Sequence, residues 1–296
     1  MLTFAGFPSC LDINELDADI AIIGVPFGVP YPGSNNHATT APQTIRQQSQ
    51  RYGRFLSHHD FNFNDQAAPQ RDIKVVDCGD VPRVAPDRQH AATEELIRTV
   101  LAKGAIPIVL GGDHSVPIPV MRAFDSAGPM CVVQIDAHID YRDEVHGIRD
   151  GLSSNMRRAS ELPHVDGIVQ IGIRGVGSAR AEEVVAARNW GTTVVRAAEI
   201  HRNGIEFALD QIPHSDRYYI TLDMDGIDPA VAPGVVAPSF GGLTYFQVFD
   251  LLRGIGQRGR IVGVDVVEVA PANDLNAITS LLAARLVLDA IEFMSR

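Results

Sequence analysis

The sequence predicts an α/β protein, a three-layer α/β/α sandwich around a mostly parallel sheet of eight strands. Short runs rich in β-branched residues recur along the chain and alternate with helical patterns. Several of these runs are apolar on both faces, as strands buried inside a parallel sheet are. An eight-stranded barrel is the alternative architecture that the same alternation allows.

The expected strands are bounded mainly by Gly, Pro or Asp, which favour turns. In chain order they are DIAIIGV (19–25), IKVVDCG (73–79), IPIVLGG (106–112), MCVVQID (130–136), IVQIGIRG (168–175), TTVVRA (192–197), RYYITLDMD (217–225) and RIVGVDVVEV (260–269).

The expected helices combine an apolar stripe with good helix formers. They cover residues 41–53, 86–104, 116–128, 179–191, 205–212, 244–256 and 278–294. Gly104, Gly191 and Gly256 stand where three of them are expected to end. No shift in composition and no low-complexity segment interrupts the pattern, so we expect residues 1–296 to form a single domain.

Composition excludes several classes of function. The chain has 296 residues, of which 45% are hydrophobic and 21% charged, and a formal net charge of −11. An acidic chain is a poor partner for nucleic acid but is compatible with a small cationic substrate. No apolar run approaches the roughly eighteen residues of a membrane span, and no leader is recognisable. The three cysteines are widely spaced without a C-x-x-C pair, which favours reduced thiols and a cytoplasmic location.

The stretch VQIDAHIDYRD (133–143) places Asp136, His138 and Asp140 at alternating positions. Residues two apart on an extended segment point to the same face. Two carboxylates and an imidazole are therefore aimed at one spot, which would be costly without a cation between them.

Three other strand ends carry similar chemistry: GGDHS with His114, the pair Asp223 and Asp225, and Glu268. Carboxyl ends of parallel strands meet at one edge of an open sheet, where ligands bind. Histidine and carboxylate without thiolate suit Mn²⁺, with Ni²⁺, Co²⁺ or Fe²⁺ as alternatives. Two imidazoles and four carboxylates exceed the needs of one ion. We therefore expect two ions, which in such pairs lie about 3.5–4 Å apart and share a bridging hydroxide.

With these motifs the sequence resembles the ureohydrolases, which include arginase, agmatinase and related guanidino-compound hydrolases. The resemblance is carried in the family's order by IIGVPFG (22–28), VVDCGD (75–80), GGDHS (111–115), DAHID (136–140), LDMDGIDP (222–229), VVEVAP (266–271) and ITSLLAARLVL (278–288). It implies an arginase-like, doubly wound sandwich with an eight-stranded parallel sheet. It also implies an agmatinase-like activity and assembly into a homotrimer or homohexamer.

The resemblance further assigns roles to single residues. One ion would be held by His114, Asp136, Asp140 and Asp223, and the other by His138, Asp136, Asp223 and Asp225. The metal-bridging hydroxide would attack the guanidinium carbon while Glu268 pairs with the guanidinium. Asp140 would stabilise the tetrahedral intermediate and pass a proton to the leaving amine, giving urea or a substituted urea. Asp113, beside His114, would support that ligand.

The loop after this motif departs from the family, whose agmatinase-like members carry an HGTPFRRA-like segment. Here His146-Gly147 gives an HG pair close to Asp140, whereas aligning MRRASE (156–161) puts Leu152 and Ser153 opposite it. We favour the second register, in which His146 faces solvent and Ser153 shapes the pocket. Residues 235–237 (Val-Val-Ala) likewise replace a polar run and predict an apolar wall.

Two alternatives to a guanidino hydrolase remain. A deacetylase-like amidohydrolase would normally use one zinc, and the second ligand pair His138 and Asp225 argues against it. A catalytically quiet, metal-stabilised subunit that partners an active homologue is disfavoured by the complete ligand set. A dinucleotide-binding protein is excluded because no G-x-G-x-x-G follows the first strand. The substrate stays open among agmatine, guanidinobutyrate, arginine and smaller or N-substituted guanidines.

Overall fold

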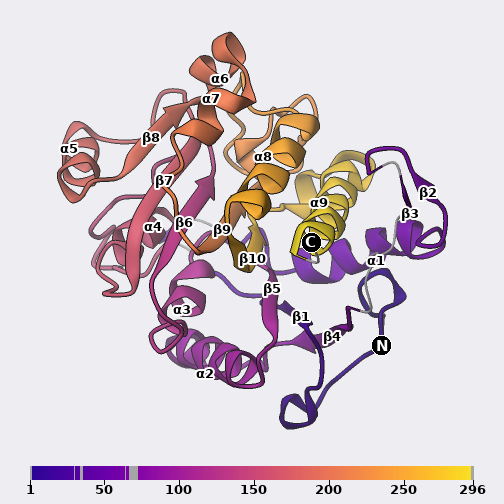
Figure 1. Cartoon of the computed structure of the whole chain (residues 1–296). Coiled ribbons are helices and arrows are strands. Elements are labelled where there is room, and N and C mark those ends of the chain that lie inside the picture. The colour runs from indigo at the N-terminus through magenta and orange to yellow at the C-terminus, as the bar shows by residue number, and fades with distance from the viewer. Residues whose placement is uncertain (1, 30, 34–35, 64, 67–72, 295–296) are drawn as a thin grey trace.

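The computed structural model describes residues 2–29, 31–33, 36–63, 65–66 and 73–294, which form an open parallel sheet covered by helices on both faces (Figure 1). Its strand order is β4-β1-β5-β10-β9-β6-β7-β8, and every neighbouring pair is parallel. The strands are β1 (Ile20–Gly24), β4 (Val75–Asp80), β5 (Ile106–Leu110), β6 (Met130–Ile135), β7 (Val165–Ile173), β8 (Thr193–Arg196), β9 (Arg217–Asp223) and β10 (Arg260–Val267). The sandwich is confirmed and the barrel is wrong, because β4 and β8 are open edges.

The seven expected helices are all present. They are α1 (Ala41–Gly53), α2 (Gln89–Ala102), α3 (Pro117–Arg122), α5 (Ala181–Trp190), α7 (Ile205–Asp210), α8 (Tyr245–Arg258) and α9 (Ile278–Met294). Gly191 ends α5 with a left-handed φ of 106°, as expected. Gly256 does not end a helix, since it lies inside α8. A Cβ there would come within 3.2 Å of the Phe293 carbonyl oxygen, so this glycine lets α8 approach α9.

Several short elements were not predicted. They are the helices α4 (Asn155–Ala159) and α6 (Ala197–Asn203) and the antiparallel pair β2 (His59–Asp60) and β3 (Asp65–Gln66). Each is too short to complete a periodic pattern in the sequence.

The two helical layers are assigned by the alternation of side chains along the strands. In β1, Ile20 and Ile22 pack into the core beneath α1, α8 and α9, whereas Ala21 and Ile23 face the core beneath α2 and α3. Figure 1 shows α1 and α9 side by side on one face, and α2 beside α3 on the other. Both faces of the sheet are therefore buried, which explains the continuous apolar runs.

The centre of the sheet positions the residues of interest. In the sheet, β5 and β6 are separated by β10 and β9, two strands that come later in the sequence. Such a switch point opens a crevice outside the carboxyl ends of the strands. Register places Val267 opposite Asp223 and Ile135 opposite Leu222, so the ends of β10, β9 and β6 lie at one level.

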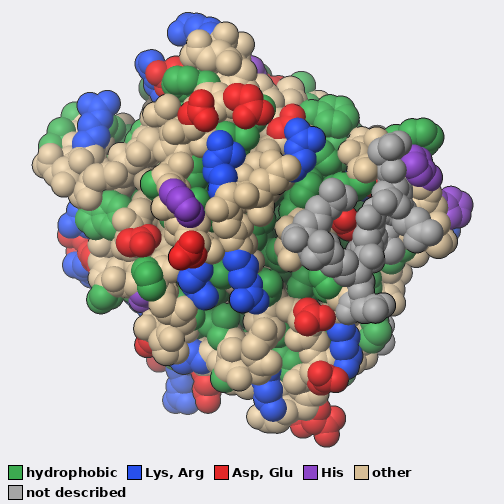
Figure 2. Space-filling model, in the orientation of Figure 1, with side chains coloured by type: hydrophobic (Ala, Val, Ile, Leu, Met, Phe, Trp, Pro, Cys, Tyr) green, Lys and Arg blue, Asp and Glu red, His purple; other side chains and the backbone are tan. Residues whose placement is uncertain are grey.

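The visible surface carries charges of both signs. Figure 2 shows acidic and basic side chains interspersed over the face drawn, with hydrophobic side chains between them. None of the helices within the described ranges has the length and apolar character required to cross a bilayer.

Candidate metal centre and adjoining cavity

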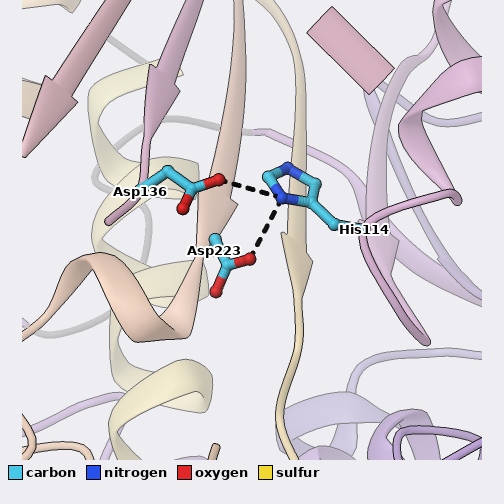
Figure 3. Close-up of side chains that lie close together, drawn as sticks. All are labelled: His114, Asp136 and Asp223. Carbon is cyan, nitrogen blue, oxygen red and sulfur yellow. Dashed lines mark ion pairs between the residues drawn. The ribbon is translucent and has the colours of Figure 1, made fainter. Parts of the chain in front are cut away.

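His114 is the centre of the first cluster. It follows β5 in the loop GGDHS, and its side chain is buried. This loop requires glycine, because a Cβ on Gly112 would lie 1.6 Å from the Phe27 carbonyl oxygen. The Nδ1 atom lies 3.0 Å from one carboxylate oxygen each of Asp136, Asp140 and Asp223. Figure 3 shows Asp136 and Asp223 pointing at this nitrogen from two different strand ends.

The proton on the His114 ring is fixed by a chain of hydrogen bonds on its other side. The Thr221 hydroxyl donates to Asp265 over 2.8 Å, so its oxygen accepts the Nε2–H of His114 over 3.0 Å. Nδ1 then carries a lone pair, and it has no hydrogen-bond partner among the described residues. A lone pair facing three carboxylate oxygens is repulsive unless a cation lies between them. These residues therefore fit a divalent metal ion, and the Thr221–Asp265 pair orients the ligand.

His138 gathers a second set of carboxylates. Its Nδ1 lies 3.1 Å from Asp225 Oδ2 and 3.4 Å from Asp136 Oδ1. Asp136 thus turns one oxygen to each imidazole. Asp223 Oδ2 faces His114, while its Oδ1 accepts the Asp225 backbone N–H over 2.7 Å. Two sets that share Asp136 could hold two neighbouring ions.

The electrostatics of this cluster are those of a site that lacks positive charge. Burial, followed by the charges of Asp225 and Asp136, raises the pKa of Asp223 well above its usual value. Burial alone would lower the pKa of His138, but Asp136 and Asp225 raise it to about 12. The shift at Asp223 favours a protonated carboxyl, and the shift at His138 favours a positively charged imidazole. Both shifts indicate an excess of negative charge in the cluster. A metal ion would supply that charge.

Asp140 is held in place by the segment that follows it. Its backbone is left-handed, with φ 44°, and its carbonyl accepts the backbone N–H groups of Met156 and Arg157 at the start of α4. Its Oδ2 accepts a 2.7 Å hydrogen bond from Asn155. The MRRASE segment is therefore joined directly to Asp140.

Glu268 follows β10 and also has a left-handed backbone, with φ 65°. Its Oε1 accepts the backbone N–H of His114 over 2.7 Å, and its Oε2 lies 2.5 Å from Nε2 of His37. Sequence reasoning missed His37, which lies in the loop before α1. Asp113 is buried nearby, and burial together with the charge of Glu268 raises its pKa to about 7.

A cavity of about 540 Å³ opens beside these groups, lined by His37, His114, His138, Asp140 and Glu268 among others. The rest of its wall includes Tyr31, Arg142, Leu152, Ser153, Val236 and Ala237. The Tyr31 hydroxyl lies 2.6 Å from the Ser153 hydroxyl, so Ser153 belongs to the wall. Val236 and Ala237 form an apolar stretch of it.

His146 lies elsewhere. It occupies the tip of a tight turn closed by two hydrogen bonds between Val145 and Ile148, and its side chain is exposed. His146 and Gly147 both have positive φ, at 53° and 79°, as a two-residue hairpin turn requires. His146 is not one of the described residues that line the cavity.

Comparisons with known proteins agree over nearly the whole chain. The model of the arginase family matches residues 18–292. Guanidinobutyrase from Pseudomonas aeruginosa is 34% identical over 97% of this chain and 90% of its own length. Guanidinopropionase from the same organism is 32% identical over 97% and 91%. The crystal structure of a hypothetical agmatinase from Burkholderia thailandensis superposes with a TM-score of 0.86 at 27% identity, covering 100% of this chain and 91% of that one.

Proposed function

We propose that this chain, which belongs to the arginase family and is a ureohydrolase, hydrolyses a guanidino compound at a centre of two metal ions. The observation that carries the proposal is the pair of clusters at His114 and His138, joined through Asp136. The products are urea, or a substituted urea, and an amine.

The residues present offer a set of donors for each ion. The first ion would be held by His114, Asp136, Asp140 and Asp223, and the second by His138, Asp136, Asp223 and Asp225. Imidazole and carboxylate donors without thiolate favour Mn²⁺, and Ni²⁺ or Co²⁺ suit the same set. When bound, the two ions supply the Lewis acidity that makes water nucleophilic near neutral pH.

The chain's own residues bind the substrate and move its proton. Glu268 accepts two parallel N–H bonds from the planar guanidinium, which orients its carbon toward the metal centre. Asp140 accepts a proton from the attacking water and delivers it to the leaving amine. Asn155 holds Asp140 in the required position through its 2.7 Å hydrogen bond.

The substrate tail extends toward the outer part of the cavity. Arg142 lines the cavity, with its Nε 3.5 Å from a carboxylate oxygen of Glu183. The remaining N–H groups of Arg142 suit a tail carboxylate, as in guanidinobutyrate, and the two relatives compared are named for guanidino acids. Glu183 would instead suit the ammonium tail of agmatine. A guanidino acid is the substrate we favour, and agmatine is the second candidate.

We further propose that residues 1–296 form one catalytic domain, cytoplasmic and assembled as a homotrimer or homohexamer. The length of the family match supports a single domain. The free state of Cys10, Cys78 and Cys131 supports a reducing compartment. Exposed large apolar side chains such as Phe61 and Phe240 support association between copies. Light scattering of the purified protein measures the oligomeric state.

The decisive experiment is urea release by the purified protein with no companion chain. Metal-free protein is reconstituted with Mn²⁺, Ni²⁺ or Co²⁺ and offered guanidinobutyrate, guanidinopropionate, agmatine, arginine and guanidine. We expect urea from at least one compound, and none without metal. Metal-loaded protein that releases no urea from any of them would favour the quiet-subunit alternative. Hydrolysis of acetylated amines instead would favour the deacetylase-like alternative.

A further inference from the structure

His37 contacts Glu268, the carboxylate of the cavity that we assign to the guanidinium group. It lies in the segment between β1 and α1, where the neighbouring Ala38 and Ala41 are fully buried and anchor the backbone. Its side chain is 18% exposed, and its Nε2 is 2.5 Å from Glu268 Oε2. The imidazole thus reaches the cavity from a part of the chain that carries none of the predicted site residues.

The direction of this hydrogen bond follows from the chemistry of its partner. An ionised carboxylate only accepts, so the Nε2–H of His37 donates to Oε2. The other oxygen, Oε1, accepts the His114 backbone N–H over 2.7 Å. Each carboxylate oxygen therefore has one donor from the protein, and a second lone pair on each oxygen is left for a ligand. The two donors together fix the plane of the carboxylate.

Glu268 needs to be held because its surroundings repel it. Its charge interacts with the neighbouring Asp113, and the carboxylates of Asp140 and Asp223 line the same cavity. Like charges in a buried site raise the free energy of the ionised carboxylate. The left-handed backbone of Glu268 is also an uncommon conformation for a residue with a side chain. Donors on both oxygens offset these costs.

We propose that His37 is a positioning residue, which donates a hydrogen bond to Glu268 and holds its carboxylate in the orientation that binds the guanidinium group. The inference rests on the proposed function, because it assumes that Glu268 pairs with the substrate. His114 and His138 belong to the two candidate metal sites, whereas His37 lies with the substrate-binding carboxylate. Its effect should therefore be on substrate binding and not on metal content.

The test compares two substitutions of His37 on the substrate that proves best. His37→Ala removes the donor, and we expect kcat/KM to fall roughly 10–100-fold, mainly through KM, the range for one hydrogen bond to a charged group. His37→Gln places an amide N–H where Nε2–H was, and should recover activity to within a few-fold. Metal ions per chain should match the wild type in both variants. His146→Ala is the matched control, a histidine removed outside the cavity.

A double-mutant cycle with Glu268→Gln tests whether His37 acts through Glu268. In the Glu268→Gln background, His37→Ala should change kcat/KM by less than about threefold, since the carboxylate it positions is gone. If turnover there is too low to follow, calorimetric binding of the same guanidino compound replaces it. Equal losses in both backgrounds would overturn the proposal, as would wild-type activity in His37→Ala. If the wild-type protein releases no urea, the proposed function fails together with the role of His37. If the wild type is active and the losses are equal in both backgrounds, only the role of His37 fails.

Discussion

Thr221→Val removes the hydroxyl that connects His114 to Asp265 while conserving the shape of the side chain. Thr221 is fully buried, so neither water nor another group replaces the lost contacts. The substitution leaves the Nε2–H of His114 unpaired and takes one of the two hydroxyl donors from Asp265, whose other donor is Tyr219. We therefore expect the His114 ring to lose the constraint that directs Nδ1 toward the carboxylates.

Two magnitudes follow from these contacts. Loss of a hydrogen bond to a buried carboxylate, with a second donor left unpaired, lowers the free energy of unfolding by about 2–4 kcal/mol. Loss of the partner that orients a metal ligand lowers metal affinity by roughly 10–100-fold. Mn²⁺ affinity is measured by competition with a chelator, and stability by thermal unfolding of the metal-free protein.

Thr93→Val is the matched control. Thr93 is also fully buried and donates one hydrogen bond, over 2.9 Å to the Gln89 carbonyl within α2, a helix that contributes no residue to the candidate metal sites or to the cavity lining. It should cost about 0.5–1.5 kcal/mol in stability and leave Mn²⁺ affinity unchanged. If Thr221→Val binds Mn²⁺ as tightly as Thr93→Val does, the Thr221–Asp265 pair does not orient His114.

Three further substitutions test other parts of the account. Glu268→Gln should lower turnover at least about tenfold with metal content unchanged, and undiminished turnover would remove Glu268 from guanidinium binding. His146→Ala should leave turnover within a few-fold, and a hundredfold loss would mean that its exposed turn reaches the site. Asp150→Asn should lower stability by about 0.5–1 kcal/mol at pH 7, because His90 and Arg122 depress the pKa of this partly exposed carboxyl. That contribution is present above the unfolded pKa of about 3.9 and lost as pH falls through the folded value, so unfolding curves of variant and wild type should converge toward pH 2.

The fold could be predicted because its signals are local. Each sheet strand is a short apolar run, and each motif residue directly follows such a run, so parallel alternation alone places Asp136, Asp223 and Glu268 at one edge. The strand order was not deducible from the runs, but the position of the motifs did not depend on it. Gly256 was misassigned because a glycine that permits helix packing and one that ends a helix look alike in sequence.

The contacts that support the site could not be predicted in the same way. His37 stands in a polar loop, and its pairing with Glu268 exists only because β1 and β10 both flank β5. Thr221 and Asp265 look like ordinary strand residues, and they meet because β9 and β10 are neighbours in register. Asn155 reaches Asp140 through a helix too short to give a pattern. Each of these contacts depends on which strands lie side by side.

The most direct test of the central claim is a titration of metal-free protein with Mn²⁺, in which ions bound per chain and urea released are measured on the same samples. The two sets of ligands that share Asp136 predict binding that saturates at two ions per chain, with urea release appearing as the second ion binds. Asp225→Asn should weaken one of the two sites and reduce urea release in parallel. Full activity at one ion per chain, with Asp225→Asn as active as the wild type, would contradict the two-metal centre.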